Sequence, residues 1–190
     1  MKKQFEEQIE LIESILTNES LINRIDLAVS WVSEALENRL PVLICGNGGS
    51  ASDALHISGE LVGRFYQERK AMNVICLNSN VTVMTAWAND YDYDSVFARQ
   101  VEAHGAAGGV CWGISTSGNS ESVIQALSQA QKMNMRTISL TGAGGGKLAL
   151  VSDLLLDVPS VSTPRIQELH MPIYHFICEQ VEASNAKNKL

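Results

Sequence analysis

Basic residues are scarce in this sequence, and long apolar runs are missing from it. Lys and Arg number 14 against 21 Asp and Glu, which gives a net charge of −7, and the basic residues form no cluster. Affinity for nucleic acid comes mostly from phosphates neutralised by Lys and Arg, so the composition argues against nucleic-acid binding. The first seven residues lead into mixed polar and apolar sequence, which predicts neither a signal peptide nor a membrane span.

Paired-cysteine motifs are also missing. The four cysteines have no C-x-x-C spacing and lie in apolar stretches, at Cys45, Cys76, Cys111 and Cys178. This usage predicts reduced core thiols in a cytoplasmic protein. A reactive role for Cys45 stays open, because this residue precedes a glycine-rich loop.

Strand-like and helix-like patterns alternate beyond about residue 40. Short apolar runs predict strands at 41–45, 71–77, 109–115, 136–141 and 153–158. Helical patterns occur at 50–66, 82–89, 95–103, 120–132 and 165–186. The alternation predicts an α/β fold in which helices cover both faces of a five-stranded, doubly wound parallel sheet.

Two further amphipathic patterns, at about 5–16 and 21–36, precede the first strand. We expect one domain over residues 1–190, made of an N-terminal helical segment at 1–39 and an α/β sandwich at 40–190. The two N-terminal helices could pack on the domain's own sheet. We favour packing against a second subunit, so residues 1–39 are predicted to be an oligomerisation segment.

A glycine-rich loop, Gly46-Asn-Gly-Gly-Ser-Ala-Ser-Asp53, follows the first predicted strand and leads into a helix. Backbone N–H groups at such a junction bind phosphate. The loop also fits the Gly-x-Gly-x-x-Ala template for dinucleotides, which requires an acidic residue at the end of the second strand. That strand ends here in Asn78-Ser-Asn80, so the sequence favours a phosphate over NAD.

A second polar loop, Ser115-Thr-Ser-Gly-Asn-Ser120, follows the third predicted strand. One hydroxyl would be enough to cap the next helix. Four hydroxyls and a glycine at the carboxyl end of a central strand instead favour a phosphate site. A Walker-type nucleotide loop is excluded, because no Gly-Lys-Ser/Thr follows the glycine.

His56 and Glu60 are four residues apart, and therefore share one face of the helix that follows the glycine-rich loop. An exposed polar pair is the simpler interpretation of this spacing. The alternative is a metal-ligand or acid/base pair beside a bound phosphate.

The last predicted helix carries two histidines, and a lone helical histidine is more often a core or surface residue, so spacing alone does not identify His175 as a site residue. Gln167 and His175 lie about 80° apart around its axis, whereas His170 lies about 140° from His175, so the two histidines should serve different surroundings. Asn89 and Asp90 follow a helix closely enough to reach hydroxyl groups of a ligand.

In combination these motifs resemble the sugar isomerase (SIS) domain family. The resemblance rests on Cys45–Ser50, His56-x-x-x-Glu60, Asn89-Asp90, Gly113–Ser120, Leu140-Thr-Gly142, and Arg165-Ile-Gln-Glu168 with His175. It is strongest to the branch that converts sedoheptulose 7-phosphate to D-glycero-D-manno-heptose 7-phosphate through an enediol. This is the first step of bacterial ADP-heptose synthesis for lipopolysaccharide-type glycans. The resemblance further implies a flavodoxin-like sheet and a homotetramer with active sites at subunit interfaces.

The resemblance also implies roles for individual residues. Glu60 and His175 would carry the proton transfer. One zinc ion per subunit would be bound by His56, Glu60, Gln167 and His175, and bound weakly, since a neutral amide is a poor zinc ligand. The substrate would be contacted by Asn47, Gly48, Gly49, Ser50, Glu60, Asn89, Asp90, Ser115, Thr116, Ser117, Ser120 and Gln167.

Two other functions stay open. A non-enzymatic relative would sense a sugar phosphate or associate with a replication initiator, but such relatives lack the equivalents of Glu60 and His175, which favours the enzyme. An isomerase for a pentose or hexose phosphate is the other alternative. Arabinose 5-phosphate isomerases usually carry a second, regulatory domain, and 190 residues leave no room for one.

Overall fold

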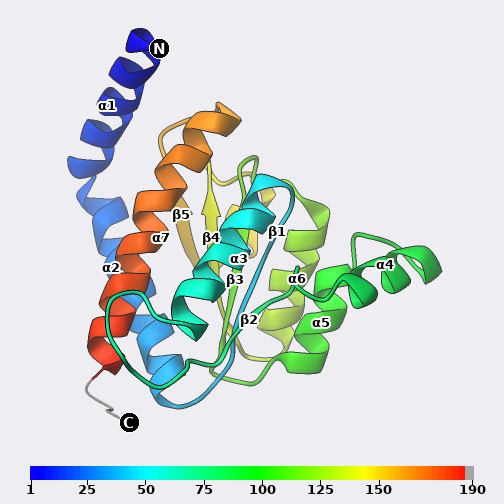
Figure 1. Ribbon diagram of the computed structural model, residues 1–190. Coiled ribbons are helices and arrows are strands. Elements are labelled where there is room, and N and C mark those ends of the chain that lie inside the picture. The colour runs from blue at the N-terminus through cyan, green and yellow to red at the C-terminus, as the bar shows by residue number, and fades with distance from the viewer. Residues whose placement is uncertain (187–190) are drawn as a thin grey trace.

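The computed structural model describes residues 1–186 and is built around a five-stranded, all-parallel sheet (Figure 1). The strands are β1 (Val42–Gly46), β2 (Val74–Cys76), β3 (Val110–Ser115), β4 (Arg136–Thr141) and β5 (Leu154–Asp157). The helices are α1 (Lys2–Leu16), α2 (Glu19–Glu37), α3 (Gly49–Val62), α4 (Val81–Asp90), α5 (Val96–His104), α6 (Glu121–Lys132), the 3-10 helix η1 (Gly146–Leu150) and α7 (Thr163–Asn185). Each predicted strand and α-helix is present, which confirms the predicted fold class.

Two predicted boundaries were wrong. The helix expected at 50–66 ends at Val62, and the strand expected at 71–77 is limited to Val74–Cys76. Between them the backbone N–H groups of residues 65–67 bond to the carboxylate of Glu182 in place of helical carbonyls. A contact with a distant helix therefore ends the local helical pattern early.

Helices cover both faces of the sheet, and alternate strand residues point to each face. Ile44 and Trp112 belong to the core under α2, α3 and α7, whereas Leu43 and Cys111 belong to the core under α5 and α6. Figure 1 shows α7, α2 and α3 on one side of the strands and α5 and α6 on the other. All four cysteines lie buried and unpaired, as predicted, and burial raises the pKa of the Cys45 thiol well above its usual range.

The strand order is β2-β1-β3-β4-β5, so the chain reverses its direction across the sheet between β1 and β3. Ligands of open α/β proteins bind at such a switch point, beyond the carboxyl ends of the strands. Gly46 at the end of β1 is in register with Ile114 of β3. The glycine-rich loop and the Ser/Thr loop, which follow these two strands, therefore leave the sheet side by side.

Helices α1 and α4 stand apart from the body of the molecule in Figure 1. The structure describes both completely, and neither contains a buried residue. Along α1 an apolar stripe is left exposed, with Phe5, Ile9, Ile12 and Leu16 each at least 40% accessible. Among residues 1–186 no helix has both the length and the apolar character that a membrane crossing requires.

Candidate active site

The glycine-rich loop between β1 and α3 is fixed by a side chain from the end of β2. The amide of Asn78 donates to the carbonyl oxygen of Gly46 at 2.8 Å and accepts from the Gly46 N–H at 3.2 Å. Gly48, which precedes α3, has a φ of 57°, a conformation that favours glycine. The asparagine that stands where a dinucleotide-binding protein needs an acid thus has a structural role in shaping the loop.

Asn47 connects this loop to two other parts of the chain. Its side-chain oxygen accepts a hydrogen bond of 2.6 Å from the Tyr93 hydroxyl, and its nitrogen donates to Ser122 Oγ at 2.9 Å. Tyr93 follows α4, and Ser122 lies in the first turn of α6. The loop is therefore held against the helix that begins after the Ser/Thr loop.

The Ser/Thr loop presents its hydroxyl groups at different depths. Ser115 is buried, Thr116 and Ser120 are half-buried, and Ser117 is exposed. The Oγ atoms of Ser115 and Ser120 lie 2.9 Å apart, across the start of α6. Hydroxyls near the N-terminus of a helix can bind an anion together with its free N–H groups.

Residues 142–147, for which the sequence predicts no chemical role, pack directly against the Ser/Thr loop. Gly118 has a φ of 65°, and a Cβ on this residue would overlap the Gly145 carbonyl group. Lys147 N donates to Asn119 Oδ1 at 3.1 Å, and Leu148 N donates to the Gly118 carbonyl at 2.9 Å. The close backbone contact explains why both segments are rich in glycine.

Three side chains with acid/base or ligand chemistry meet between α3 and α7. His56 Nε2 lies 3.1 Å from Glu60 Oε1 and 3.4 Å from His175 Nε2. The pKa of His175 is lowered, first by burial and second by the neighbouring His56, while Glu60 acts in the opposite direction. The predicted pair on α3 therefore joins the histidine on α7 that spacing alone did not identify as a site residue.

This trio fits a metal ion of the zinc type. The ligand atoms of His56, Glu60 and His175 all lie within 4.8 Å of one another. Two ligands about 2.1 Å from a tetrahedral metal would lie about 3.4 Å apart, which is close to the spacing found here. Two imidazoles and one carboxylate are also a known set of protein ligands for catalytic zinc.

A buried tyrosine lies behind His56. The Tyr174 hydroxyl is 3.1 Å from His56 Nδ1 and donates a hydrogen bond of 3.5 Å to Asp53 Oδ1. Burial raises the pKa of Tyr174, and the Asp53 carboxylate adds to this effect, so the phenol keeps its proton. Burial also raises the pKa of Asp53, although the bond from Tyr174 and the nearby His56 oppose the shift.

An ion pair below the trio joins α7 to the end of α3. Arg69 Nε and Glu182 Oε1 are 3.3 Å apart, and both side chains are 1% exposed. Arg69 Nη2 donates to the backbone carbonyl of Glu60 at 2.9 Å, and Nη1 donates to that of Gly63 at 3.0 Å. The ring of Phe65, in the segment that Glu182 binds, packs edge-on against His175.

Gln167 lies apart from the trio within one chain. Its amide packs against Gly49, where a Cβ would overlap it, and Ser50 is buried nearby at the start of α3. Gln167 precedes His175 by eight residues of α7, which is about 12 Å along the helix axis. The structure thus brings Gln167 to the glycine-rich loop, and brings only three of the four expected metal ligands together.

The remaining candidates lie at the edge of the site or in the core. Asn89 and Asp90 are exposed at the end of α4, where Asn89 Nδ2 donates to Asp90 Oδ1 at 2.9 Å. His170 is fully buried, with Nε2 3.2 Å from the Thr141 carbonyl oxygen. The predicted separation of His170 from His175 is therefore confirmed.

Sequence reasoning missed Tyr93, Tyr174 and Asp53 as residues that shape the site. Tyr93 lies in a polar run typical of a solvated turn, and Asp53 stands in the first turn of a helix, where an acid usually acts as a cap. Both patterns depend only on neighbours in the chain. Tyr174 precedes His175 directly, yet a lone tyrosine on an apolar helix face gives no signal of a polar contact. Their partners lie 46, 118 and 121 residues away.

The fold and site define a parallel α/β protein with two loops suited to anions at its switch point. Comparison with known proteins agrees with this class, because the model of the SIS domain family matches residues 4–142. The chain therefore belongs to the SIS domain family.

Within this family the chain groups with the phosphoheptose isomerases. It is 48% identical to phosphoheptose isomerase of Helicobacter pylori over 96% of this chain and 94% of that protein. It is 42% identical to that of Aneurinibacillus thermoaerophilus, over 100% of this chain and 96% of that protein. The solved structure of phosphoheptose isomerase from Neisseria gonorrhoeae superposes with a TM-score of 0.89 at 38% identity, covering 96% of each chain.

Proposed function

We propose that this chain is an aldose–ketose isomerase that converts sedoheptulose 7-phosphate to D-glycero-D-manno-heptose 7-phosphate, the first step of bacterial ADP-heptose synthesis. The observation that carries the proposal is the meeting of Glu60 and His175 around His56. A base and an acid held this close can move a proton between neighbouring carbons. The near full-length similarity to phosphoheptose isomerases supports the choice of substrate.

The proposed substrate site spans both loops at the switch point. Ser115, Thr116, Ser117 and Ser120 would bind the phosphate through their hydroxyls and through N–H groups at the start of α6. The sugar would be contacted by Asn47, Gly48, Gly49, Ser50, Glu60, Asn89, Asp90 and Gln167. The packing of Gln167 against Gly49 supports a shared role of these two residues in sugar binding.

In the proposed mechanism, Glu60 removes a proton from the carbon next to the ketose carbonyl. His175 supplies a proton to the carbonyl oxygen, which gives an enediol. Return of the carbon-bound proton to the neighbouring carbon, with loss of a proton from the other oxygen, completes the aldose. An imidazole is suited to this role, because histidine can both give and accept a proton near neutral pH.

We further propose that His56, Glu60 and His175 hold one zinc ion per subunit. When bound, zinc would supply Lewis-acid stabilisation of negative charge on the sugar oxygens. A fourth ligand from Gln167 would have to come from a neighbouring subunit, because Gln167 and His175 of one chain are two helical turns apart.

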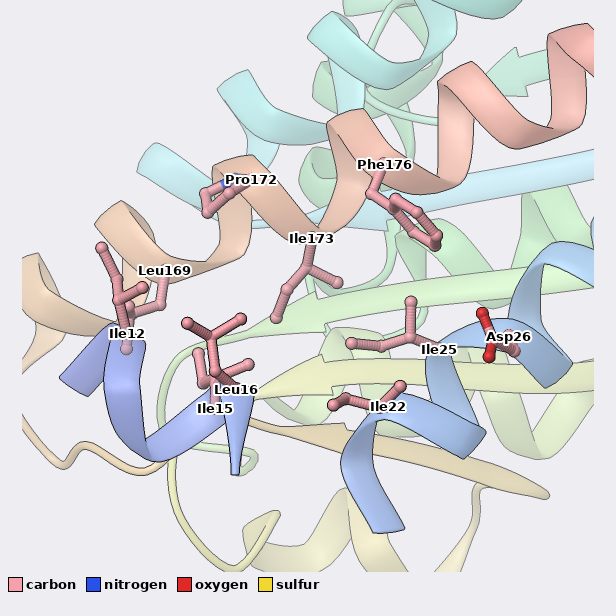
Figure 2. Close-up of a pocket in the computed structure, with 10 residues that line it drawn as sticks. All are labelled: Ile12, Ile15, Leu16, Ile22, Ile25, Asp26, Leu169, Pro172, Ile173 and Phe176. Atoms are coloured by element: carbon pink, nitrogen blue, oxygen red, sulfur yellow. The ribbon is translucent and has the colours of Figure 1, made fainter. Parts of the chain in front are cut away.

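The proposed assembly is a homotetramer in which residues 1–39 form the oligomerisation segment. Figure 2 shows a groove between α1, α2 and α7 whose lining is apolar except for Asp26. The lining residues are Ile12, Ile15, Leu16, Ile22, Ile25, Asp26, Leu169, Pro172, Ile173 and Phe176. Burial of this groove against another copy would bring α7, which also carries His175, to a subunit interface. The four unpaired cysteines support a cytoplasmic location.

The proposal is tested by following sedoheptulose 7-phosphate by NMR in deuterated buffer with the wild-type protein and a Glu60→Gln variant. The wild type should form the aldose and incorporate deuterium at the carbons that exchange. Glu60→Gln should lower kcat about 100- to 10,000-fold, because the amide cannot act as a base.

The matched control is Glu37→Gln, which changes an exposed glutamate at the end of α2 that has no hydrogen bond or ion pair with His56, Glu60 or His175 among the described residues. This variant should retain wild-type kcat. Deuterium exchange without a new sugar would reject sedoheptulose 7-phosphate as the substrate. A folded wild type that binds the sugar phosphate but gives neither exchange nor product would reject the enzyme in favour of a sugar-phosphate sensor.

A further inference from the structure

Two buried polar side chains, Asp53 and Tyr174, form a row of hydrogen-bonding contacts that leads from the core to His56 of the trio. Asp53 is 9% exposed, and Tyr174 is fully buried. The Tyr174 hydroxyl lies between the two other groups, 3.5 Å from Asp53 Oδ1 and 3.1 Å from His56 Nδ1. His56 Nε2, on the other side of the ring, faces Glu60 and His175. The two nitrogens of His56 therefore meet two separate environments.

The contacts of His56 fix the orientation of its ring. The Tyr174 hydroxyl, which also contacts Asp53, meets Nδ1 on one edge of the imidazole. The Glu60 carboxylate meets Nε2 on the other edge at 3.1 Å. A metal ion bound at Nε2 would leave the ring proton on Nδ1, where the Tyr174 oxygen can accept it.

The burial of Asp53 indicates that the contacts among Asp53, Tyr174 and His56 have a function. Its second oxygen, Oδ2, is buried without a hydrogen-bond partner among the described residues. A buried polar atom without a partner lowers stability, so a phenylalanine and an apolar residue would pack more favourably at these two positions. A site that needs an oriented histidine gives a reason for keeping them polar.

We propose that Tyr174 and Asp53 are positioning residues that hold the His56 ring in its orientation, with Nε2 presented to Glu60 and His175. The inference rests on the proposed function, because it assumes that His56, Glu60 and His175 serve the isomerisation. It adds residues that act through His56 and do not touch the substrate.

The test uses a Tyr174→Phe variant, which keeps the ring and removes only the hydroxyl. Zinc affinity, measured by competition with a chelating dye, should fall about tenfold or more. With zinc added, kcat should fall by about the same factor while KM stays within about twofold.

Tyr66→Phe is the matched control, because the Tyr66 ring is exposed and loss of its hydroxyl should leave zinc affinity and kcat unchanged. A Tyr174→Phe protein with wild-type zinc affinity and kcat would overturn the inference. If the zinc affinity falls as expected while the wild type does not isomerise sedoheptulose 7-phosphate, the positioning role stands and the proposed function is rejected.

Discussion

At the scale of single residues, α7 carries two histidines in opposite surroundings. His175 faces the site, whereas His170 is fully buried beside the Thr141 carbonyl, and burial lowers the pKa of His170 to about 4. The folded protein therefore keeps His170 neutral over a range in which an unfolded chain would protonate it. The residue type is the same, and the packing of the helix decides which histidine can take part in chemistry.

This difference predicts a loss of stability in mild acid. Because the pKa of His170 is depressed in the folded state, the unfolded state binds the extra proton as the pH falls from about 6.5 to about 4. The free energy of unfolding should fall across this window by about 2–3 kcal/mol from this residue. Urea unfolding of wild type and His170→Gln at pH 7 and pH 4.5 measures it. Equal pH dependence in the two proteins would contradict the assignment.

At the scale of elements, the Ser/Thr loop depends on its close contact with residues 142–147. Gly118→Ala should place a Cβ against the Gly145 carbonyl in addition to straining a positive φ. We expect it to lower stability by more than about 2 kcal/mol and to raise KM for the sugar phosphate, because the loop must move.

Gly144→Ala is the matched control, since Gly144 has a φ of 79° but no atom of the described residues lies within 4 Å of the position that an added Cβ would take. Its cost should be limited to about 1–2 kcal/mol of backbone strain, with KM unchanged. Thermal unfolding and steady-state kinetics compare the two variants. A similar effect of both would show that backbone strain, and not the contact with Gly145, matters here.

The order and type of the elements could be predicted from the sequence because each strand is a short apolar run bounded by polar or glycine residues. The neighbouring positions of the glycine-rich loop and the Ser/Thr loop could be predicted too, since parallel strands place such loops at one edge of the sheet. The pairing of His56 with Glu60 also follows from local geometry, because four residues make one helical turn. These features depend on neighbours in the chain.

The missing parts depend on how helices pack. The early end of α3 follows from Glu182, which lies more than 100 residues away, and the contact of His56 with Tyr174 requires α3 and α7 to lie side by side. The separation of Gln167 from His175 could have been calculated from helical rise alone. The resemblance placed both on one metal ion, and within a single chain α7 holds them apart.

At the scale of the whole molecule, the apolar groove of Figure 2 predicts that assembly can be weakened by one charge. Leu16 lines the groove and is 68% exposed in the single chain, so Leu16→Glu should not disturb folding of the α/β sandwich. It should shift the proposed tetramer to smaller species in sedimentation velocity, and lower kcat if the site lies at an interface.

Ser14→Glu introduces the same charge on the opposite side of α1, where the residue is exposed and does not line the groove. It should leave both the sedimentation coefficient and kcat unchanged. A Leu16→Glu protein that sediments like the wild type would contradict the assignment of this groove to assembly.

The lack of any buried residue in α1, a helix that the structure describes in full, bears on how the chain is made. An isolated helix of 15 residues is marginal in water, because its nucleation is costly and packing normally supplies its stability. Residues 2–16 leave the ribosome before the strands do, yet we expect them to become ordered last, when chains meet. Newly made copies would therefore pass through a stage in which the sheet is complete and the first helix still fluctuates.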